Sequence, residues 1–422
     1  MKKIKLYPIF VCFWVALALV VMVAPNAFAD WQAQTPAQST SYTTATMPAP
    51  NGLTASANST WSTPQNVDGS NDLISVSCPT TTFCMAITDL GQASSWNGST
   101  WSVPQIANPL GTGLYSVSCP TSTFCMAVVN NSYAFTWNGS TWTLSQITNT
   151  GGTDLYSVSC PTSTFCAAVG DKGYASTWNG STWSTPVQLD LNSGLSSVSC
   201  PTSTFCVAVS QDGHAFPYTQ SGWSVWPNIA STALSTISCL SATFCMAVNN
   251  AGNAFTWNGS TWTPSQIPGG NSGLFSVSCP TTSFCMATDG DGEASSWDGS
   301  TWSGPVSIFS HTSTAYYPPV SCPATTFCMT AYVEQSAVWN GTTTLSWTHP
   351  STTTDALGNP LVFTQDILGC SGSNCSPNTV VANGLSSAAT SYTSSVNDTC
   401  YAVESVSRSG SWTAVSNAVC VT

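Results

Sequence analysis

Residues 118–125 read Ser-Cys-Pro-Thr-Ser-Thr-Phe-Cys, and this string or a close copy of it occurs seven times along the chain. The first cysteines of the copies are Cys78, Cys119, Cys160, Cys200, Cys239, Cys279 and Cys322. Successive copies are 41, 41, 40, 39, 40 and 43 residues apart. A period near 40 residues is typical of a four-stranded propeller blade. The sequence therefore predicts an all-β fold, a seven-bladed β-propeller over residues 57–342.

Each repeat contains four short apolar runs separated by turn signals. In the second copy these runs are residues 114–119, 124–129, 133–137 and 141–147. Asn138-Gly139 lies between the last two runs, and Asn-Gly favours a two-residue hairpin because both residues tolerate a positive φ. The same dipeptide recurs in most copies, as at Asn97-Gly98 and Asn340-Gly341. We therefore expect a hairpin at this dipeptide between the last two strands of each such blade, with Asp298-Gly299 as a variant and residues 219–222 of the fourth blade as the exception.

The two cysteines of each copy are six residues apart, across the expected first hairpin, so we pair them within each copy. The predicted bridges are Cys78–Cys84, Cys119–Cys125, Cys160–Cys166, Cys200–Cys206, Cys239–Cys245, Cys279–Cys285 and Cys322–Cys328. The alternative is zinc ligation. The spacing argues against it, because the short Cys-x-x-Cys knuckle and matching histidines are absent from these strings.

The tryptophans of the repeat predict how the ring closes. Trp61 resembles the fourth-strand tryptophans but precedes the first copy, and Trp339 in the last copy has no blade-like fourth strand after it. We therefore expect residues 58–65 to complete the last blade, which joins both ends of the ring and removes free sheet edges. The repeated tryptophans, such as Trp96 and Trp101, are expected in the core between blades.

The N-terminus predicts export. Lys2, Lys3 and Lys5 precede an apolar run, and Ala27-Phe28-Ala29 is a small-x-small cleavage signal, so residues 1–29 are interpreted as a signal peptide. An uncleaved membrane anchor is the alternative, but the run is short for a span. Residues 30–47, rich in Ser, Thr, Gln and Pro, are expected to be a disordered leader. We expect a secreted protein, extracellular or at the cell surface, that is not an integral membrane protein after cleavage.

The charge balance excludes one class of partner. The chain has 5 Lys plus Arg against 17 Asp plus Glu. Three of the five basic residues leave with the signal peptide, so the formal charge of the remainder is 2 − 17 = −15. A nucleic-acid partner is not expected, because such a chain cannot neutralise phosphates.

Two family resemblances follow from these motifs. The Ser-Trp-Asn-Gly-Ser-Thr-Trp strings, as at residues 95–101, resemble a shortened Asp-box of sialidase-type propellers, in which that motif is structural. Residues 343–422 resemble a fibronectin type III domain of bacterial secreted proteins, with residues 344–348 as its second strand, including Trp347, and residues 400–406 as its sixth. The resemblance implies a β-sandwich.

The first strand of that sandwich is missing before Thr344. Residues 48–55 look like such a strand, so we expect the domain to comprise residues 48–56 and 343–422, with the propeller inserted after its first strand. Within it we expect the bridges Cys370–Cys375 and Cys400–Cys420, although four cysteines allow three pairings.

The variable parts of the repeat predict where a ligand binds. The turns between second and third strands and the loops between blades differ among copies, and variation on a fixed scaffold is where binding residues are placed. Eleven acidic residues fall there: Asp68, Asp72, Asp89, Asp154, Asp171, Asp190, Asp212, Asp289, Asp291, Glu293 and Glu334. This face is predicted to bind a cation, a cationic partner, or a sugar through a metal. The alternative is that these acidic residues serve only to form turns and to keep the surface soluble.

Three groups on this face are the predicted site residues. Asp289, Asp291 and Glu293 alternate with glycines and suit Ca²⁺, which prefers oxygen ligands, as a possible cofactor. Asp171 and Asp212 are predicted ligand-binding residues. His311, Tyr316 and Tyr317, in the longest loop between blades, are predicted sugar-binding residues. Packing against the C-terminal domain is the alternative for this loop.

The sequence disfavours catalysis. A sialidase needs an arginine cluster, and Arg408 is the single arginine of the chain. His214, His311 and His349 lie in no triad-like motif. We predict a non-catalytic binding protein for a glycan or cell-wall polymer. A structural or adhesive protein that recognises a cell-surface protein is one alternative, and a hydrolase with a carboxylate pair is the other.

Overall fold

The computed structural model describes residues 51–67, 71–147, 154–269, 273–309 and 317–348, and six further segments towards the C-terminus: 363–370, 379–385, 391–394, 400–407, 413–416 and 419–420. The predicted signal peptide and leader lie outside these residues. The chain divides into two compact units. The propeller unit is Ser59–Gly341, and the second unit combines Met1–Asn58 with Thr342–Thr422.

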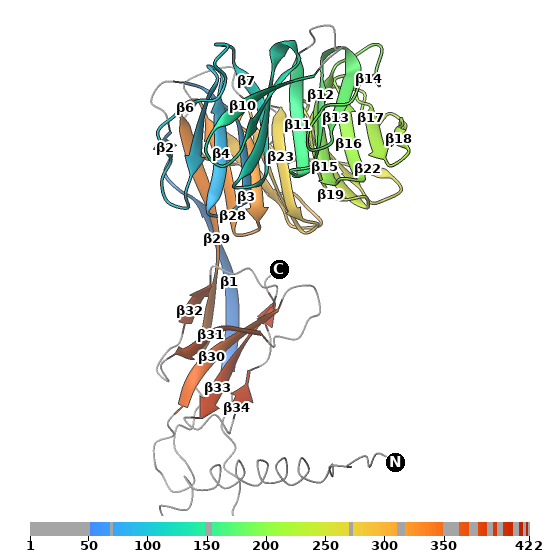
Figure 1. Cartoon of the computed structure of the whole chain (residues 1–422). Helices are drawn as coiled ribbons and strands as arrows, with labels where there is room; N and C mark the ends of the chain where they lie inside the picture. The colour runs from blue at the N-terminus through green and yellow to red at the C-terminus, as the bar shows by residue number, and fades with distance from the viewer. Residues whose placement is uncertain are drawn as a thin grey trace, which may run out of the picture. The chain divides into compact units, whose positions relative to one another are not determined.

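Six blades of the propeller unit are antiparallel four-stranded sheets, numbered here in chain order (Figure 1). Blade 1 contains β3 (Leu73–Thr80), β4 (Phe83–Thr88), β5 (Gln92–Trp96) and β6 (Gln105–Ile106). Blade 2 contains β7 (Leu114–Thr121), β8 (Phe124–Val129), β9 (Tyr133–Trp137) and β10 (Trp142–Gln146). Blade 3 contains β11 (Leu155–Thr162), β12 (Phe165–Gly170), β13 (Tyr174–Trp178) and β14 (Val187–Gln188). Short 3₁₀ turns, η1 (Asn130–Ser132) and η2 (Asp171–Gly173), connect the second and third strands of blades 2 and 3.

The next three blades repeat the same order. Blade 4 contains β15 (Leu195–Thr202), β16 (Phe205–Ser210), β17 (Ala215–Thr219) and β18 (Gly222–Trp223). Blade 5 contains β19 (Leu234–Ser241), β20 (Phe244–Asn249), β21 (Asn253–Trp257) and β22 (Trp262–Gln266). Blade 6 contains β23 (Leu274–Thr281), β24 (Phe284–Asp289), β25 (Glu293–Trp297) and β26 (Val306–Ser307). These strands agree with the sequence prediction to within two residues in the second copy.

Blade 7 is completed by the N-terminal part of the chain. Its own strands are β27 (Val320–Ala324), β28 (Phe327–Tyr332) and β29 (Gln335–Thr348), and both β1 (Asn51–Trp61) and β2 (Gln65–Asn66) pair with β29. Trp61 contacts Trp339 with 5.6 Å between ring centroids. The distance between Trp96 and Trp101 of blade 1 is 5.7 Å, so the junction repeats an ordinary blade contact. The predicted ring closure is therefore confirmed.

The hairpin predicted at each Asn-Gly dipeptide is wrong in its type. Gly98 has φ of 98°, whereas Asn97 is absent from the residues with positive φ, so the two-residue type I′ turn does not form. Instead Asn97 Oδ1 accepts hydrogen bonds from the backbone N–H groups of Ser99 and Thr100 at 3.0 and 2.9 Å. The side chain thereby closes a four-residue loop. In blade 7, Asn340-Gly341 lies inside β29 and forms no hairpin.

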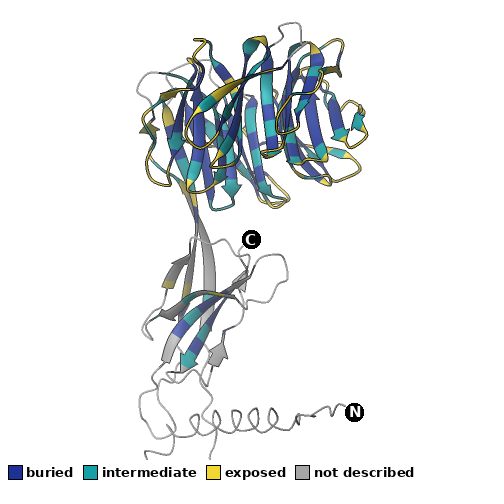
Figure 2. Ribbon diagram, in the orientation of Figure 1, coloured by how far each residue is buried: buried dark blue, intermediate teal, exposed yellow. Residues whose placement is uncertain are grey.

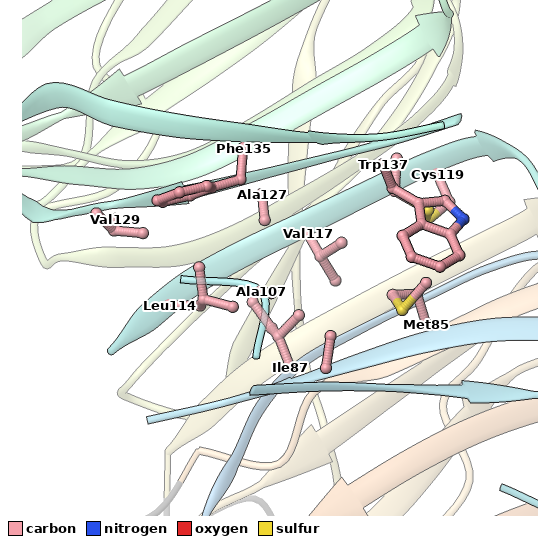
Figure 3. Packing of buried hydrophobic residues seen from close by; sticks show 12 residues of the cluster. Met85, Ile87, Ala107, Leu114, Val117, Cys119, Ala127, Val129, Phe135 and Trp137 are labelled. Atoms are coloured by element: carbon pink, nitrogen blue, oxygen red, sulfur yellow. A yellow bond between two sulfur atoms is a disulfide. The ribbon is translucent and has the colours of Figure 1, made fainter. Parts of the chain in front are cut away.

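The core lies between neighbouring blades, and Figure 2 shows that buried residues make up much of the strands of the propeller unit. Met85 and Ile87 of blade 1 share a buried cluster with Leu114 and Val117 of blade 2 (Figure 3). Trp96 likewise packs with residues of blade 7. Alternate residues of each strand supply such a cluster, because successive side chains of a strand point to opposite faces. The repeated tryptophans are interblade core, as predicted.

One series of seven equivalent hydrogen bonds connects the first strands around the ring. In each, a serine hydroxyl oxygen of one blade accepts from the backbone N–H of a cysteine in the next, at 2.9–3.1 Å. The serine–cysteine pairs are Ser77–Cys119, Ser118–Cys160, Ser159–Cys200, Ser199–Cys239, Ser238–Cys279, Ser278–Cys322 and Ser321–Cys78. The repeated Ser-Cys therefore has two roles, a disulfide within its blade and a hydrogen bond between blades.

All seven predicted propeller disulfides form, each between cysteines six residues apart. They indicate an oxidising environment such as the extracellular space. Of the cysteines in the other two predicted bridges, Cys375 lies outside the described residues. The backbone register places Cys400 opposite both Cys370 and Cys420, and their pairing stays a prediction. No helix among the described residues has the length and apolar character needed to cross a membrane.

The second unit contains two sheets. One sheet contains β30 (Phe363–Cys370), β31 (Thr379–Leu385), β33 (Cys400–Ser407), β34 (Thr413–Val415) and β35 (Val419–Cys420). In the other, β32 (Ser391–Ser394) pairs with the C-terminal part of β29. Leu53 of β1 packs against a buried cluster that includes Trp347 and Tyr401. Residues from both ends of the sequence thus share one core.

Candidate functional site

The variable turns and the loops between blades lie at one end of the ring. The backbone N–H of Asp89 donates to the carbonyl of Asp72 at 3.0 Å, and that of Asp171 donates to the carbonyl of Asp154 at 2.9 Å. Each bond joins a turn between second and third strands to the loop that precedes its blade. We call this end of the propeller unit the loop face. The opposite end, with the disulfide hairpins and the Asn-Gly loops, is the hairpin face.

The structure gives Asp289 a role in its own turn. Asp289 is buried, and its Oδ1 accepts from the backbone N–H groups of Asp291 and Glu293 at 3.0 and 2.9 Å. In blade 5, Asn249 does the same for its turn at 3.1 and 2.9 Å. Burial raises the pKa of Asp289, although these backbone hydrogen bonds act in the opposite direction. The calcium site at Asp289, Asp291 and Glu293 stays a prediction, and a neutral side chain fills the equivalent position in blade 5.

Of the predicted aromatic residues, His311 and Tyr316 lie outside the described residues. Tyr317 is described and exposed. Its ring lies 4.1 Å from that of Phe275 in blade 6, centroid to centroid. The structure thus places Tyr317 on the propeller, next to a residue that sequence reasoning did not select.

Phe275 belongs to a set of positions that the sequence analysis missed. A β-bulge interrupts the start of the first strand in blades 1–6. At this bulge the residue after the leading leucine has no partner in the second strand. The bulged residues are Ile74, Tyr115, Tyr156, Ser196, Ser235 and Phe275. Bulges re-aim side chains and are common next to binding sites. This position varies among the otherwise similar first strands, which was the available signal.

Tyr115 and Tyr156, on adjacent blades, form an aromatic pair on the loop face. Their rings meet edge to face with 6.2 Å between centroids, and Tyr115 is 39% exposed. Burial and then the carboxylates of Asp171 and Asp154 raise the pKa of Tyr156. The predicted residue Asp171 therefore lies beside an aromatic surface. This arrangement can take a ligand with an apolar face and polar edges.

A second group lies further round the loop face. Among the described residues, Asp190, Asp212 and His214 are the three that could hold a metal ion, with one ligand atom from each within 4.8 Å of the others. Asp190 lies in the loop between blades 3 and 4, whereas Asp212 and His214 flank Gly213 in the turn of blade 4. The sequence analysis selected Asp212 but not His214, because Asp190 approaches the histidine only in the folded ring.

Short-range hydrogen bonds organise this turn. His214 Nδ1 lies 2.9 Å from Asp212 Oδ1, and the hydroxyl of Ser210 donates to the same oxygen. Burial raises the pKa of Asp212, but the hydrogen bonds from Ser210 and His214 outweigh it, and the net pKa is lowered. The Ser210 hydroxyl bonds to the Asp212 carboxylate and to the backbone of His214, and among the described residues no histidine ring bonds to it. This order does not build a serine nucleophile.

Gly194 lies between the tyrosine pair and the turn that holds Asp212 and His214. A Cβ atom at Gly194 would lie 3.6 Å from Cε2 of Tyr156 and 3.7 Å from both Cα of Asp171 and Cδ of Gln211. Gln211 directly precedes Asp212. On the far side of this turn, the carbonyl of Gly213 accepts from Ile229 and Ala230 at 3.0 and 3.3 Å. A shallow hollow of about 300 Å³ is lined by Asn228, Ile229, Ala230 and Ser231.

The comparisons with known proteins support the fold. Among solved structures, the chain is similar to the crystal structure of the WD40 beta propeller domain of Doa1, with a TM-score of 0.57 and 11% sequence identity. The match covers 67% of this chain and 97% of that chain. No protein-family model and no curated protein matches the chain. At this identity the similarity shows the fold alone, and the chain is an all-β, seven-bladed propeller protein.

Proposed function

We propose that the chain is a non-catalytic extracellular binding protein whose loop face binds a glycan or a cell-wall polymer. Propellers commonly serve in binding and protein interaction, and fold alone does not select the ligand. The observation that supports a glycan ligand is the Tyr115–Tyr156 pair, of which Tyr115 is exposed and Tyr156 half-buried, beside Asp154 and Asp171. Aromatic rings cover the apolar faces of sugars, and carboxylates accept hydrogen bonds from hydroxyl groups.

The compartment belongs to the same proposal. The disulfides of the propeller suit an oxidising environment, and the N-terminal segment has the features of a signal peptide. We therefore place the protein outside the cell or on its surface.

The second unit is proposed to be a fibronectin type III sandwich interrupted by the propeller. Its support is the pairing of β29 with both β1 and β32, and a separate sheet ordered β31-β30-β33-β34. Leu53 packs against the cluster around Trp347. This arrangement gives a two-sheet unit whose first strand precedes the propeller and whose second strand follows it.

A protein partner is the second candidate. Leu90, Leu110 and Leu191 lie in loops of the loop face and are 60%, 49% and 82% exposed. Exposed apolar side chains gathered on one face are more typical of a protein interface than of a glycan site. A partner with an apolar surface would use these leucines.

The test is binding of the oxidised, secreted protein to immobilised glycans and cell-wall polymers. We expect Tyr115→Ser and Tyr156→Ser each to weaken glycan binding roughly tenfold, equivalent to about 1.4 kcal/mol. Blades 4 and 5 carry Ser196 and Ser235 at the same bulge, so the blade accepts serine there. Asp171→Asn should also weaken binding.

The matched control is Asp298→Asn on the hairpin face. It makes the same charge change, and Asn97 holds the equivalent position in blade 1. Unchanged binding in both tyrosine variants, or no binding to any polymer, would overturn the glycan proposal. Capture of a protein that is lost on Leu90→Ser would then support the second candidate.

A further inference from the structure

The junction of blades 3 and 4 brings together one imidazole and two carboxylates, and we propose that Asp190, Asp212 and His214 form a binding site for a divalent first-row transition-metal ion such as Zn²⁺. One ligand atom from each residue lies within 4.8 Å of the others. The inference goes beyond the proposed glycan binding and does not depend on it.

The burial of Asp190 is the second observation. Asp190 is 7% exposed, and its Oδ1 accepts from the backbone N–H groups of Asn192 and Ser193 at 2.9 and 3.2 Å. These two hydrogen bonds hold the Asp190 carboxylate in place beside Asp212 and His214, where one of its oxygens lies within reach of the ion that those two residues would share.

The distances suit one shared ion. His214 Nδ1 and Asp212 Oδ1 are 2.9 Å apart. Two ligands of a tetrahedral zinc ion, each at about 2.0–2.1 Å, lie about 3.3 Å from one another. A metal ion can therefore replace the hydrogen that these atoms share with little movement of the turn. The short Asp212-Gly213-His214 segment holds both ligands on one turn.

The ligand set selects the class of metal. Calcium and magnesium prefer oxygen ligands alone. An imidazole nitrogen with two carboxylates suits zinc and its neighbours in the first transition row. Three protein ligands leave at least one coordination position for water or another ligand, as in zinc sites that are not purely structural.

Other blades show that the backbone does not need these three side chains. Gln92 and Asn253 occupy the position of His214 in blades 1 and 5, and Ala251 occupies that of Asp212 in blade 5. Asn108 follows blade 1 as Asp190 follows blade 3, and its Oδ1 also accepts a backbone N–H, that of Leu110, at 2.9 Å. The same local structure therefore forms with neutral residues.

These equivalents supply the variants for the test. Tag-free, oxidised protein is treated with chelator, dialysed and titrated calorimetrically with Zn²⁺, then with Mn²⁺ and Ca²⁺. We expect saturable Zn²⁺ binding at one site per chain, and a rise in the melting temperature with Zn²⁺ concentration. Asp190→Asn, Asp212→Ala and His214→Gln should each weaken Zn²⁺ binding roughly tenfold or more.

The matched control is Glu293→Gln, at the position of His214 in blade 6. It should leave Zn²⁺ affinity unchanged. Circular dichroism of each variant checks the fold, and His214→Asn, which copies the asparagine of blade 5, is the second variant at this position. No saturable Zn²⁺ binding, or Zn²⁺ binding that all three variants retain, would overturn the proposal and leave Asp212–His214 as a hydrogen bond that shapes the turn.

Discussion

The hydroxyl oxygen of Ser321 accepts a hydrogen bond from the backbone N–H of Cys78 at 2.9 Å, across 243 residues of sequence. The same bond joins Ser118 to Cys160 within the repeat array, also at 2.9 Å. Blades 7 and 1 are therefore joined as two consecutive blades are. A closed ring without free edges resists pairing with other chains.

Ser321→Ala tests this closure directly. The substitution leaves the buried N–H of Cys78 without its acceptor, which should lower the free energy of unfolding by about 1–3 kcal/mol. Ser118→Ala is the control, because it removes the same bond between consecutive blades. Chemical denaturation should give similar losses for both variants. A neutral Ser321→Ala beside a costly Ser118→Ala would mean that the ring is open in solution.

Trp61→Ala should destabilise the propeller although Trp61 precedes the first repeat. Trp61 contacts Trp339 in the cluster of blade 7. Removing a packed tryptophan costs about 3 kcal/mol or more. Thermal unfolding followed by tryptophan fluorescence measures the change. A shift no larger than that of an exposed substitution such as Val103→Ala would contradict the role of the N-terminal segment in blade 7.

Each disulfide closes a short loop, and its loss should be tolerated singly. Replacing Cys119 and Cys125 together by alanine should cost about 2 kcal/mol on a chain-entropy estimate for a six-residue separation. The bridges reinforce hairpins that the blade packing already holds. Denaturant midpoints of the oxidised variant and the wild type give the difference. Complete failure of the variant to fold would show that the bridge is needed to form the blade.

Two aspartates should respond in opposite directions to replacement by asparagine. Burial raises the pKa of Asp289, so its charged form opposes folding. The stability that the protonated carboxyl contributes is fully present below the ordinary pKa of 3.8. It is lost as the pH rises through the higher pKa of the folded protein. Asp289→Asn should therefore raise the melting temperature at pH 7, and the gain should vanish below about pH 3.8.

Asp298 shows the reverse. Hydrogen bonds led by the backbone N–H of Thr301 lower its pKa to about 2. Its charge supports folding above the ordinary value of 3.8, and the support is lost as pH falls through about 2. Asp298→Asn should thus slightly lower the melting temperature at pH 7 and have no effect well below pH 2. Melting curves at several pH values test both aspartates, and shifts of the same sign would contradict these electrostatic assignments.

The repeat made most of the fold predictable. Strand limits, the seven disulfides and the completion of blade 7 all follow from a motif repeated at one period, because each copy must bury the same faces against its neighbours. The turn type at Asn97-Gly98 was wrong, since the side chain of Asn97 takes the backbone donors that a type I′ turn would use otherwise. Whether the dipeptide forms a type I′ turn or a longer loop closed by the asparagine side chain depends on local geometry. The turn preferences of Asn and Gly do not specify that geometry.

The candidate site was predictable only in part. Asp171 and Asp212 were selected from the variable turns, and both lie on the loop face. Tyr115 and Tyr156 were not selected, because the bulge that re-aims them leaves no pattern within a single copy. His214 was placed in no catalytic motif and was not selected as a ligand, since its neighbour Asp190 belongs to another blade.

The sequence by itself determined the class of fold, the number of blades, the pairing of the propeller cysteines and the absence of a basic surface. These properties depend on period, spacing and composition, which are local or summed along the chain. Only the tertiary structure decided that Asp190 meets His214, that Tyr115 meets Tyr156, and that Ser321 bonds to Cys78. Closing the ring brings separate loops together, and the resulting contacts arise between blades, where bulges and turns decide which side chains meet.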